Sequence, residues 1–116
     1  MTHPVVTKPT PVVSVVIPLY QKTRHIAAAI CVAYRSCSLA DVAFELVVVD
    51  DGSTDGSSEV VRDWAAGAPA HASVLHLIRQ ENQGAAAARN AGWKAARGEG
   101  ILFLDAEDTW EDQDLK

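Results

Sequence analysis

The stretch "ELVVVDDGSTDGSS" at residues 45–58 decides the fold class, because an apolar run meets a polar turn there without a linker. Residues 45–49 are apolar after the glutamate, and such a run predicts a strand that is buried on both faces. Residues 50–58 consist of Asp, Gly, Ser and Thr, which are residue types that favour tight turns. The expected unit is therefore a buried strand that ends in a polar loop.

The same alternation extends in both directions along the chain. Further strands are predicted at residues 12–17, 73–79 and 101–104, and Pro18 is expected to end the first of them. A helical pattern follows each of the first three strands. The order βαβαβαβ with short connections predicts an α/β fold, a doubly wound, mostly parallel open sheet of four strands with three helices.

The three helices differ in composition. Ile26 and Ile30 belong to an apolar stripe at helical spacing, and Thr23 is the expected N-cap of that helix. A second helix is predicted at residues 59–66. The third, at residues 84–97, is rich in alanine, and its small residues allow close packing on a sheet.

The bulk composition indicates one globular domain. The chain has 116 residues, a net charge of −5 and 48% hydrophobic residues. Residues 1–11 hold three prolines and no periodicity, so a flexible tail is expected there and the domain at residues 12–116. The acidic balance argues against a nucleic-acid-coating protein.

A cytoplasmic location is expected. The first residues lack an apolar core of signal-peptide length, and no apolar run approaches the roughly 20 residues of a transmembrane helix. The spacing of Cys31 and Cys37 fits no zinc pattern, so we expect buried or idle thiols, which suit a reducing compartment. A peripheral place at the inner face of a membrane, through a partner, is compatible with these features.

Polar residues gather where the predicted strands end. The four ends read "PLYQ", "DDGSTD", "RQENQG" and "DAED", and open parallel sheets bind ligands at this edge. The Rossmann fingerprint, the P-loop and the G-x-S-x-G elbow are absent from the sequence. A phosphate-accepting receiver domain also places paired acids at strand ends, but it requires a later lysine-bearing strand.

Asp105, Glu107 and Asp108 follow the last predicted strand directly. Carboxylates this close repel one another, and a cation would relieve the repulsion. Alternatively Asp108 or Thr109 is the N-cap of a helix with acids in its first turn. The ten residues around this cluster leave both interpretations open.

Three stretches in the right order resemble the nucleotide-sugar-binding half of family-2-type glycosyltransferases, which have the Rossmann-like GT-A fold. They are "VSVVIPLYQK" at 13–22, "ELVVVDDGSTDGS" at 45–57 and "NQGAAAARNAGWKAARGEGILFLDAED" at 82–108. The resemblance covers nearly the whole chain outside its tail. "DAED" stands where the family has its D-x-D motif, with Glu107 in place of the usual aspartate.

The resemblance implies roles for individual residues. Pro18 and Tyr20 match positions that contact the nucleobase and ribose of the donor, and Asp51 matches the acceptor of a hydrogen bond from a uracil-type base. Arg89 matches a helix arginine that reaches the nucleotide or braces the acidic loop. Asp50, Ser53 and Asp55 are expected to shape the turn, Asp55 as a turn or N-cap residue.

A divalent metal, Mn²⁺ or Mg²⁺, is also implied. Asp105 would approach the ribose and the metal, Glu107 would coordinate the metal, and Asp108 is a substitute ligand.

The implied activity is transfer of a sugar, with inversion, from a nucleotide-diphosphate donor, expected to be UDP-linked. The acceptor would be a glycan, a lipid or a protein. The catalytic base is expected beyond Lys116, so no catalytic residue is named. The alternative is a non-catalytic nucleotide-binding or interaction module that lacks the acceptor half. An exposed edge at residues 101–104 would favour self-association.

Overall fold

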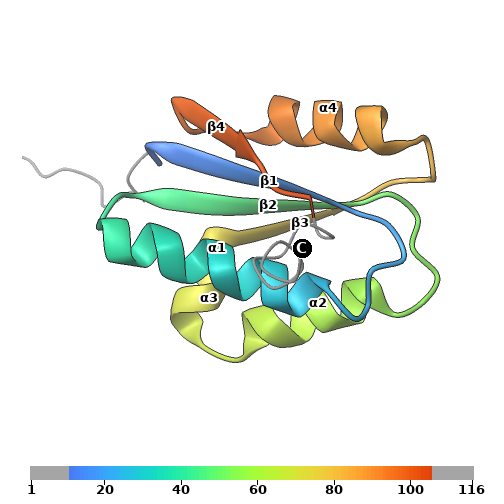
Figure 1. Cartoon of the computed structure of the whole chain (residues 1–116), viewed down its shortest axis with the longest axis horizontal. Helices are drawn as coiled ribbons and strands as arrows, with labels where there is room; N and C mark the ends of the chain where they lie inside the picture. Colours follow the sequence, from blue (N-terminus) through green and yellow to red (C-terminus); the bar gives the residue numbers. More distant parts are fainter. Residues whose placement is uncertain (1–10, 106–116) are drawn as a thin grey trace, which may run out of the picture.

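The computed structural model describes residues 11–105. Four parallel strands form one sheet in the order β3-β2-β1-β4 (Figure 1). The strands are β1 (Val13–Leu19), β2 (Phe44–Asp50), β3 (Leu75–Arg79) and β4 (Gly100–Phe103). The helices are α1 (Ile26–Ala40), α2 (Ser57–Ala66), α3 (Pro69–Val74) and α4 (Ala85–Ala95). The α/β class and the parallel sheet predicted from the sequence are confirmed.

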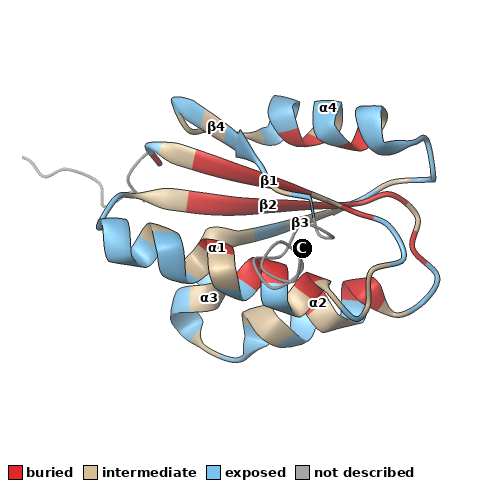
Figure 2. Ribbon diagram, viewed as in Figure 1, coloured by how far each residue is buried: buried red, intermediate tan, exposed pale blue. Residues whose placement is uncertain are grey.

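Helices cover both faces of the sheet, with α1, α2 and α3 on one side and α4 on the other (Figure 1). The larger apolar cluster lies under α1 and α2 and includes Ile17, Ile26 and Leu46. The smaller lies under α4 and includes Val16 and Val49. Both central strands, β1 and β2, are therefore buried on two faces, as Figure 2 shows in red.

Small residues let α4 approach the sheet closely. Ala88 is buried against β1 and β2, and a Cβ atom added to Gly92 would lie 2.3 Å from Cγ1 of Val16. The helix thereby brings its N-terminal end to the edge where the strands end (Figure 1).

Within residues 11–105 there is one more helix than the sequence predicted. Residues 69–74 form the short helix α3, so β3 starts two residues later than expected, at Leu75. Pro69 occupies the first helical position, where its fixed φ suits a helix start. The ring of His71 then stacks on Trp64 of α2, with centroids 3.9 Å apart.

Pro18 was expected to end the first strand, but β1 continues one residue further, to Leu19. Successive residues of a central parallel strand bond alternately to its two neighbours. Val16 O accepts from Leu104 N on the β4 side, whereas Leu19 O accepts from Asp51 N on the β2 side. The missing N–H of Pro18 therefore faces the β4 side, just beyond the last β1–β4 pair, and the β1–β2 ladder continues past it to Leu19.

A buried carboxylate ties the opposite end of the sheet together. Glu45 accepts hydrogen bonds from Ser14 Oγ and Arg97 N, each at 2.7 Å, and its Oε1 lies 3.3 Å from Nε2 of His76. Burial acts to raise the pKa of Glu45, but these donors outweigh it and the pKa is lowered. The start of β2 is thus fixed to β1, β3 and the segment that leads into β4.

Two remaining expectations concern the cysteines and membrane spans. Both thiols are free, but Cys31 is exposed and Cys37 is half-buried, so neither is fully buried. No helix within residues 11–105 combines the length and apolar character that crossing a bilayer requires.

Candidate functional site

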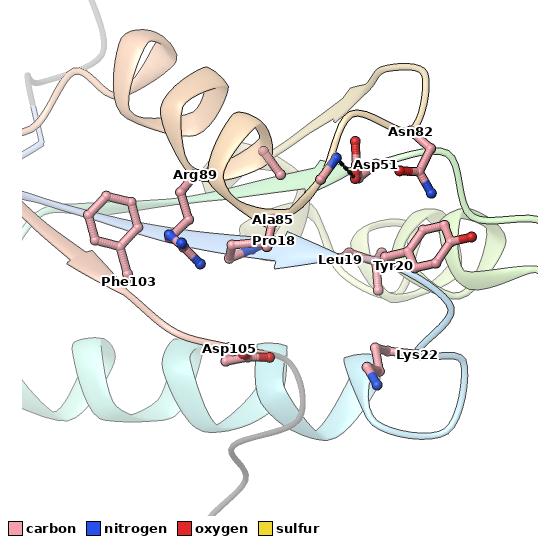
Figure 3. Close-up of a pocket in the computed structure, with 12 residues that line it drawn as sticks. Pro18, Leu19, Tyr20, Lys22, Asp51, Asn82, Ala85, Arg89, Phe103 and Asp105 are labelled. Carbon is pink, nitrogen blue, oxygen red and sulfur yellow. Dashed lines mark hydrogen bonds between the residues drawn. The ribbon is translucent and has the colours of Figure 1, made fainter.

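A pocket of about 460 Å³ opens at the carboxyl ends of the strands. All five residues that the sequence predicted for nucleotide-sugar binding line it, namely Pro18, Tyr20, Asp51, Arg89 and Asp105 (Figure 3). Their convergence follows from the parallel topology, which brings the loops after β1, β2 and β4 and the start of α4 to one edge.

Asp51 is almost fully buried, at 3% exposure, and holds the loop between β3 and α4. Its Oδ1 accepts from Gln80 Nε2 at 3.0 Å and from Gln83 N at 2.8 Å. Its Oδ2 accepts from Gly84 N at 2.9 Å (Figure 3). Burial acts to raise the pKa of Asp51, but the three hydrogen bonds outweigh it and lower the pKa. The carboxylate is therefore ionised at neutral pH.

Asp50 is fully buried and is not among the pocket-lining residues. It accepts from Ser53 N at 2.8 Å and from the Ser58 hydroxyl, and it lies 3.6 Å from Nε of Arg79. The adjacent acids therefore have separate tasks. Asp50 orients the loop after β2, as expected, and Asp51 faces the pocket.

Asp55 is not the N-cap of α2. That position belongs to Gly56, whose φ of 88° lies in the left-handed region. Asp55 Oδ1 accepts from Ser57 N, the first amide of the helix, and Oδ2 accepts from Thr23 N at 3.2 Å. Thr23 in turn does not cap α1, because His25 occupies that N-cap position without a side-chain hydrogen bond. Both residues join two loops instead.

The N-terminal end of α4 contributes to the pocket wall. Gly84 and Ala85 line the pocket, and Gly84 has a φ of 102° that a residue with a side chain rarely adopts. The first amides of a helix and its dipole favour an anion at this end. Arg89, one turn further on, adds an exposed cation to the same wall.

Only Asp105 of the predicted metal ligands is described. Its exposed side chain lines the pocket, whereas Glu107 and Asp108 lie outside the described residues. Across residues 11–105, no three His, Cys, Asp or Glu side chains come close enough to hold a metal ion. Asp105 supplies the hard oxygen donor that Mg²⁺ and Mn²⁺ prefer.

The pocket also contains residues that the sequence interpretation missed. Lys22, Asn82 and Phe103 all line it. Each lies within three residues of the end of a strand or in the loop before α4. The rule that ligands bind at strand ends could therefore have identified them.

The sequence model of glycosyl transferase family 2 matches residues 14–116. The chain belongs to this family. It is 39% identical to a glycosyltransferase of Nostoc sp. over 90% of the chain and 30% of that relative. It is 35% identical to an undecaprenyl-phosphate 4-deoxy-4-formamido-L-arabinose transferase of Aeromonas hydrophila, over 82% of the chain and 28% of that relative.

Solved structures agree with this assignment. A mannosyltransferase from Pyrobaculum calidifontis, in complex with GDP-Man and Mn²⁺, superposes with a TM-score of 0.73. It is 33% identical, over 86% of this chain and 28% of that protein. S. aureus TarS 1–349, in complex with UDP-GlcNAc, gives a TM-score of 0.66 at 30% identity, over 89% of this chain and 30% of that protein. In each of these comparisons the chain spans only part of the relative's length, about 30% in the case of the Nostoc protein.

Proposed function

We propose that residues 12–116 are the nucleotide-sugar-binding half of a glycosyltransferase that uses a UDP-linked donor. The observation that carries this proposal is the convergence of Pro18, Tyr20, Asp51, Arg89 and Asp105 on one pocket. Tyr20 offers an exposed ring for contact with the base and ribose, and Asp51 offers a charged acceptor.

The hydrogen bonds of Asp51 support a uracil-type base. A carboxylate has about four acceptor positions, two on each oxygen. Protein donors occupy both positions of Oδ1 and one position of Oδ2. With the donors of residues 11–105 counted, one acceptor position is left, and uracil presents a single imide N–H between two carbonyls. Guanine presents two adjacent N–H donors on one edge, and this pair suits a carboxylate with both oxygens free.

Positive groups support a diphosphate beside the base. Lys22 and Arg89 line the pocket together with the N-terminal end of α4. We also propose a divalent cation, Mn²⁺ or Mg²⁺, held by Asp105 and Glu107, with Asp108 as the substitute for Glu107. When bound, such a cation offsets the charge that develops on the leaving diphosphate.

The acceptor is proposed to be a glycan, a lipid or a protein, with inversion at the sugar. The Aeromonas relative, whose name specifies an undecaprenyl-phosphate transferase, supports a lipid and hence a place on the cytoplasmic face of a membrane. No residue among 11–105 is proposed as the catalytic base. The second candidate function is a non-catalytic nucleotide-binding or interaction module.

Calorimetric titration of the chain with UDP and GDP tests the donor proposal. UDP should bind more tightly, and N3-methyl-UDP should bind weakly because it lacks the imide N–H. Asp51→Asn should weaken UDP binding by roughly 1.5–3 kcal/mol, the cost of losing a hydrogen bond to a charged group. Asp63→Asn, an exposed position on α2, is the matched control. Equal affinity for UDP and N3-methyl-UDP would remove Asp51 from base recognition.

A transfer assay separates the two candidate functions. Release of free UDP from a UDP-sugar in the presence of an acceptor indicates an enzyme. Tight UDP binding without any release across a panel of glycan and lipid acceptors favours the binding module.

A further inference from the structure

Three consecutive backbone amides after β1 donate to three alternate side chains after β2. Gln21 N donates to Ser53 Oγ at 2.9 Å, and Lys22 N donates to Ser57 Oγ at 3.1 Å. The third amide, Thr23 N, donates at 3.2 Å to Oδ2 of Asp55, which lies between Ser53 and Ser57 in the sequence. We name this arrangement the amide clasp, formed by Ser53, Asp55 and Ser57 on residues 21–23.

Two further contacts tighten the amide clasp from the side of the first loop. The Thr23 hydroxyl donates to the carbonyl oxygen of Asp55 at 2.8 Å. The Gln21 side chain reaches back, and its Oε1 accepts from Thr54 N at 2.6 Å. Gln21 adopts a left-handed φ of 55°, which a non-glycine residue rarely takes without compensating contacts. The clasp supplies such contacts.

The loop held by the clasp carries pocket residues, whereas the clasp side chains do not line the pocket. Tyr20 and Lys22 flank Gln21 and both line the pocket (Figure 3). Asp55 is the central member, because it binds Thr23 N through one oxygen and the Ser57 amide and hydroxyl through the other. Asp55 therefore connects the loop after β1 with the first turn of α2.

We propose that Asp55 is a positioning residue that fixes Tyr20 and Lys22 in the orientation that receives the nucleotide. This inference rests on the proposed function. Residues 20–25 belong to no strand or helix, and the backbone bonds from His25 N and Ile26 N to Lys22 O leave the amides of residues 21–23 to the clasp. Without the clasp these three amides would hydrogen-bond to water. Donor binding would then have to order the loop, at a cost in affinity.

A double-mutant cycle on UDP affinity tests the proposal. Asp55→Ala should weaken UDP binding about 2- to 12-fold, the fold-change equivalent to one net hydrogen bond. In a Tyr20→Ala, Lys22→Ala background the same change should have little further effect, because the side chains through which Asp55 acts are gone. Asp63→Ala on α2 is the control and should leave UDP affinity unchanged.

A second variant separates positioning from stability of α2. Thr23→Val keeps the side-chain shape and removes the hydroxyl bond to the carbonyl oxygen of Asp55, together with the 3.3 Å contact between the Thr23 and Ser57 hydroxyls. It leaves in place the bond from the Ser57 amide to the Asp55 side chain. Like Asp55→Ala, this variant should weaken UDP binding. Hydrogen exchange gives an independent measure: the amides of residues 21–23 should exchange faster in Asp55→Ala, while those of α4 keep their protection.

Two results would overturn the positioning role while leaving the proposed function in place. One is unchanged UDP affinity in Asp55→Ala. The other is an equal loss of affinity in both backgrounds, which indicates general destabilisation. Failure of the wild-type chain to bind any nucleoside diphosphate would overturn the proposed function and, with it, this inference.

Discussion

Gly92 of α4 lies so close to Val16 of β1 that a Cβ atom on the glycine would be 2.3 Å from Cγ1 of the valine. The second neighbour, Cγ2 of Val49, would be 3.2 Å away. A contact of 2.3 Å requires the helix or the buried strand to shift, and Val16 is fully buried in a β-branched core. The spacing between α4 and the sheet therefore depends on glycine at this position.

Gly92→Ala should destabilise the protein. Overpacking typically costs about 1–3 kcal/mol, whereas the gain in helix propensity is at most about 1 kcal/mol. Asn90→Ala, on the exposed side of the same helix, is the matched control and should be neutral or slightly stabilising. Urea titration gives the free energy of unfolding of each variant, and we expect a lower value for Gly92→Ala than for Asn90→Ala. A Gly92→Ala variant as stable as Asn90→Ala would show that the interface adapts.

Acid should lower the free energy of unfolding, because three hydrogen-bonded carboxylates have lowered pKa values in the folded chain. Partial desolvation acts to raise the pKa of Asp55, but hydrogen bonds from Ser57 and Thr23 outweigh it and lower the pKa from 3.8 to about 2. The pKa values of Asp51 and Glu45 are lowered as well. At pH values between the lowered pKa values of the folded chain and the ordinary pKa values of the unfolded chain, the unfolded chain binds more protons. The free energy of unfolding therefore rises with pH in that interval.

The contribution of Asp55 is fully present above about pH 4 and is lost as the pH falls through about 2. Urea midpoints measured between pH 5 and pH 2 should therefore fall less steeply for Asp55→Asn than for the wild type. Asp63→Asn should follow the wild-type curve. Identical slopes for all three proteins would mean that Asp55 does not contribute to the acid transition.

Much of the site could be predicted because it depends on patterns that are local in the sequence. The apolar run before Asp50 and Asp51 fixes a buried strand, and the parallel topology then brings its end beside Tyr20 and Arg89. The amide clasp could not be predicted in this way. Asp55 and its partner Thr23 are 32 residues apart in sequence, and local turn chemistry offered Asp55 a plausible partner within its own loop.

The helix α3 was missed for a similar reason. Its six residues have no apolar periodicity, and none of them is buried. Stacking of His71 on Trp64, with a hydrogen bond of 2.9 Å between His71 Nδ1 and Trp64 O, fixes its position against α2. Contacts of this kind between neighbouring elements become visible only when the fold is known.

The edge of the described sheet should promote self-association. Within residues 11–105, β4 has one neighbour, and Leu102 and Phe103 are 59% and 50% exposed. Unpaired strand edges with apolar side chains pair readily between chains. We expect sedimentation velocity to show association that increases with concentration and is reduced by Leu102→Lys. Leu39→Lys, at an exposed leucine of α1, is the control, and a concentration-independent monomer would contradict the expectation.

The predicted metal site is tested by titrating UDP with and without Mn²⁺. If Glu107 is a ligand, Glu107→Ala should remove most of the gain in UDP affinity that Mn²⁺ gives. Loss of an outer-shell partner costs about 10–100-fold in metal affinity, so loss of a direct ligand should cost at least that. Glu107→Asp restores the residue that the family usually has, and it should retain or improve the gain.

Two variants locate the metal within the acidic cluster. Asp105→Asn, like Glu107→Ala, should lose most of the gain in UDP affinity that Mn²⁺ gives, because Asp105 lines the pocket and is the other predicted ligand. Glu99→Gln, at an exposed acid just before β4, should keep it. If Glu107 only supports a helix start, Glu107→Ala should slightly lower thermal stability and leave the Mn²⁺ gain intact. The same gain in the wild type and both Glu107 variants would make Asp105 and Asp108 the better pair of ligands.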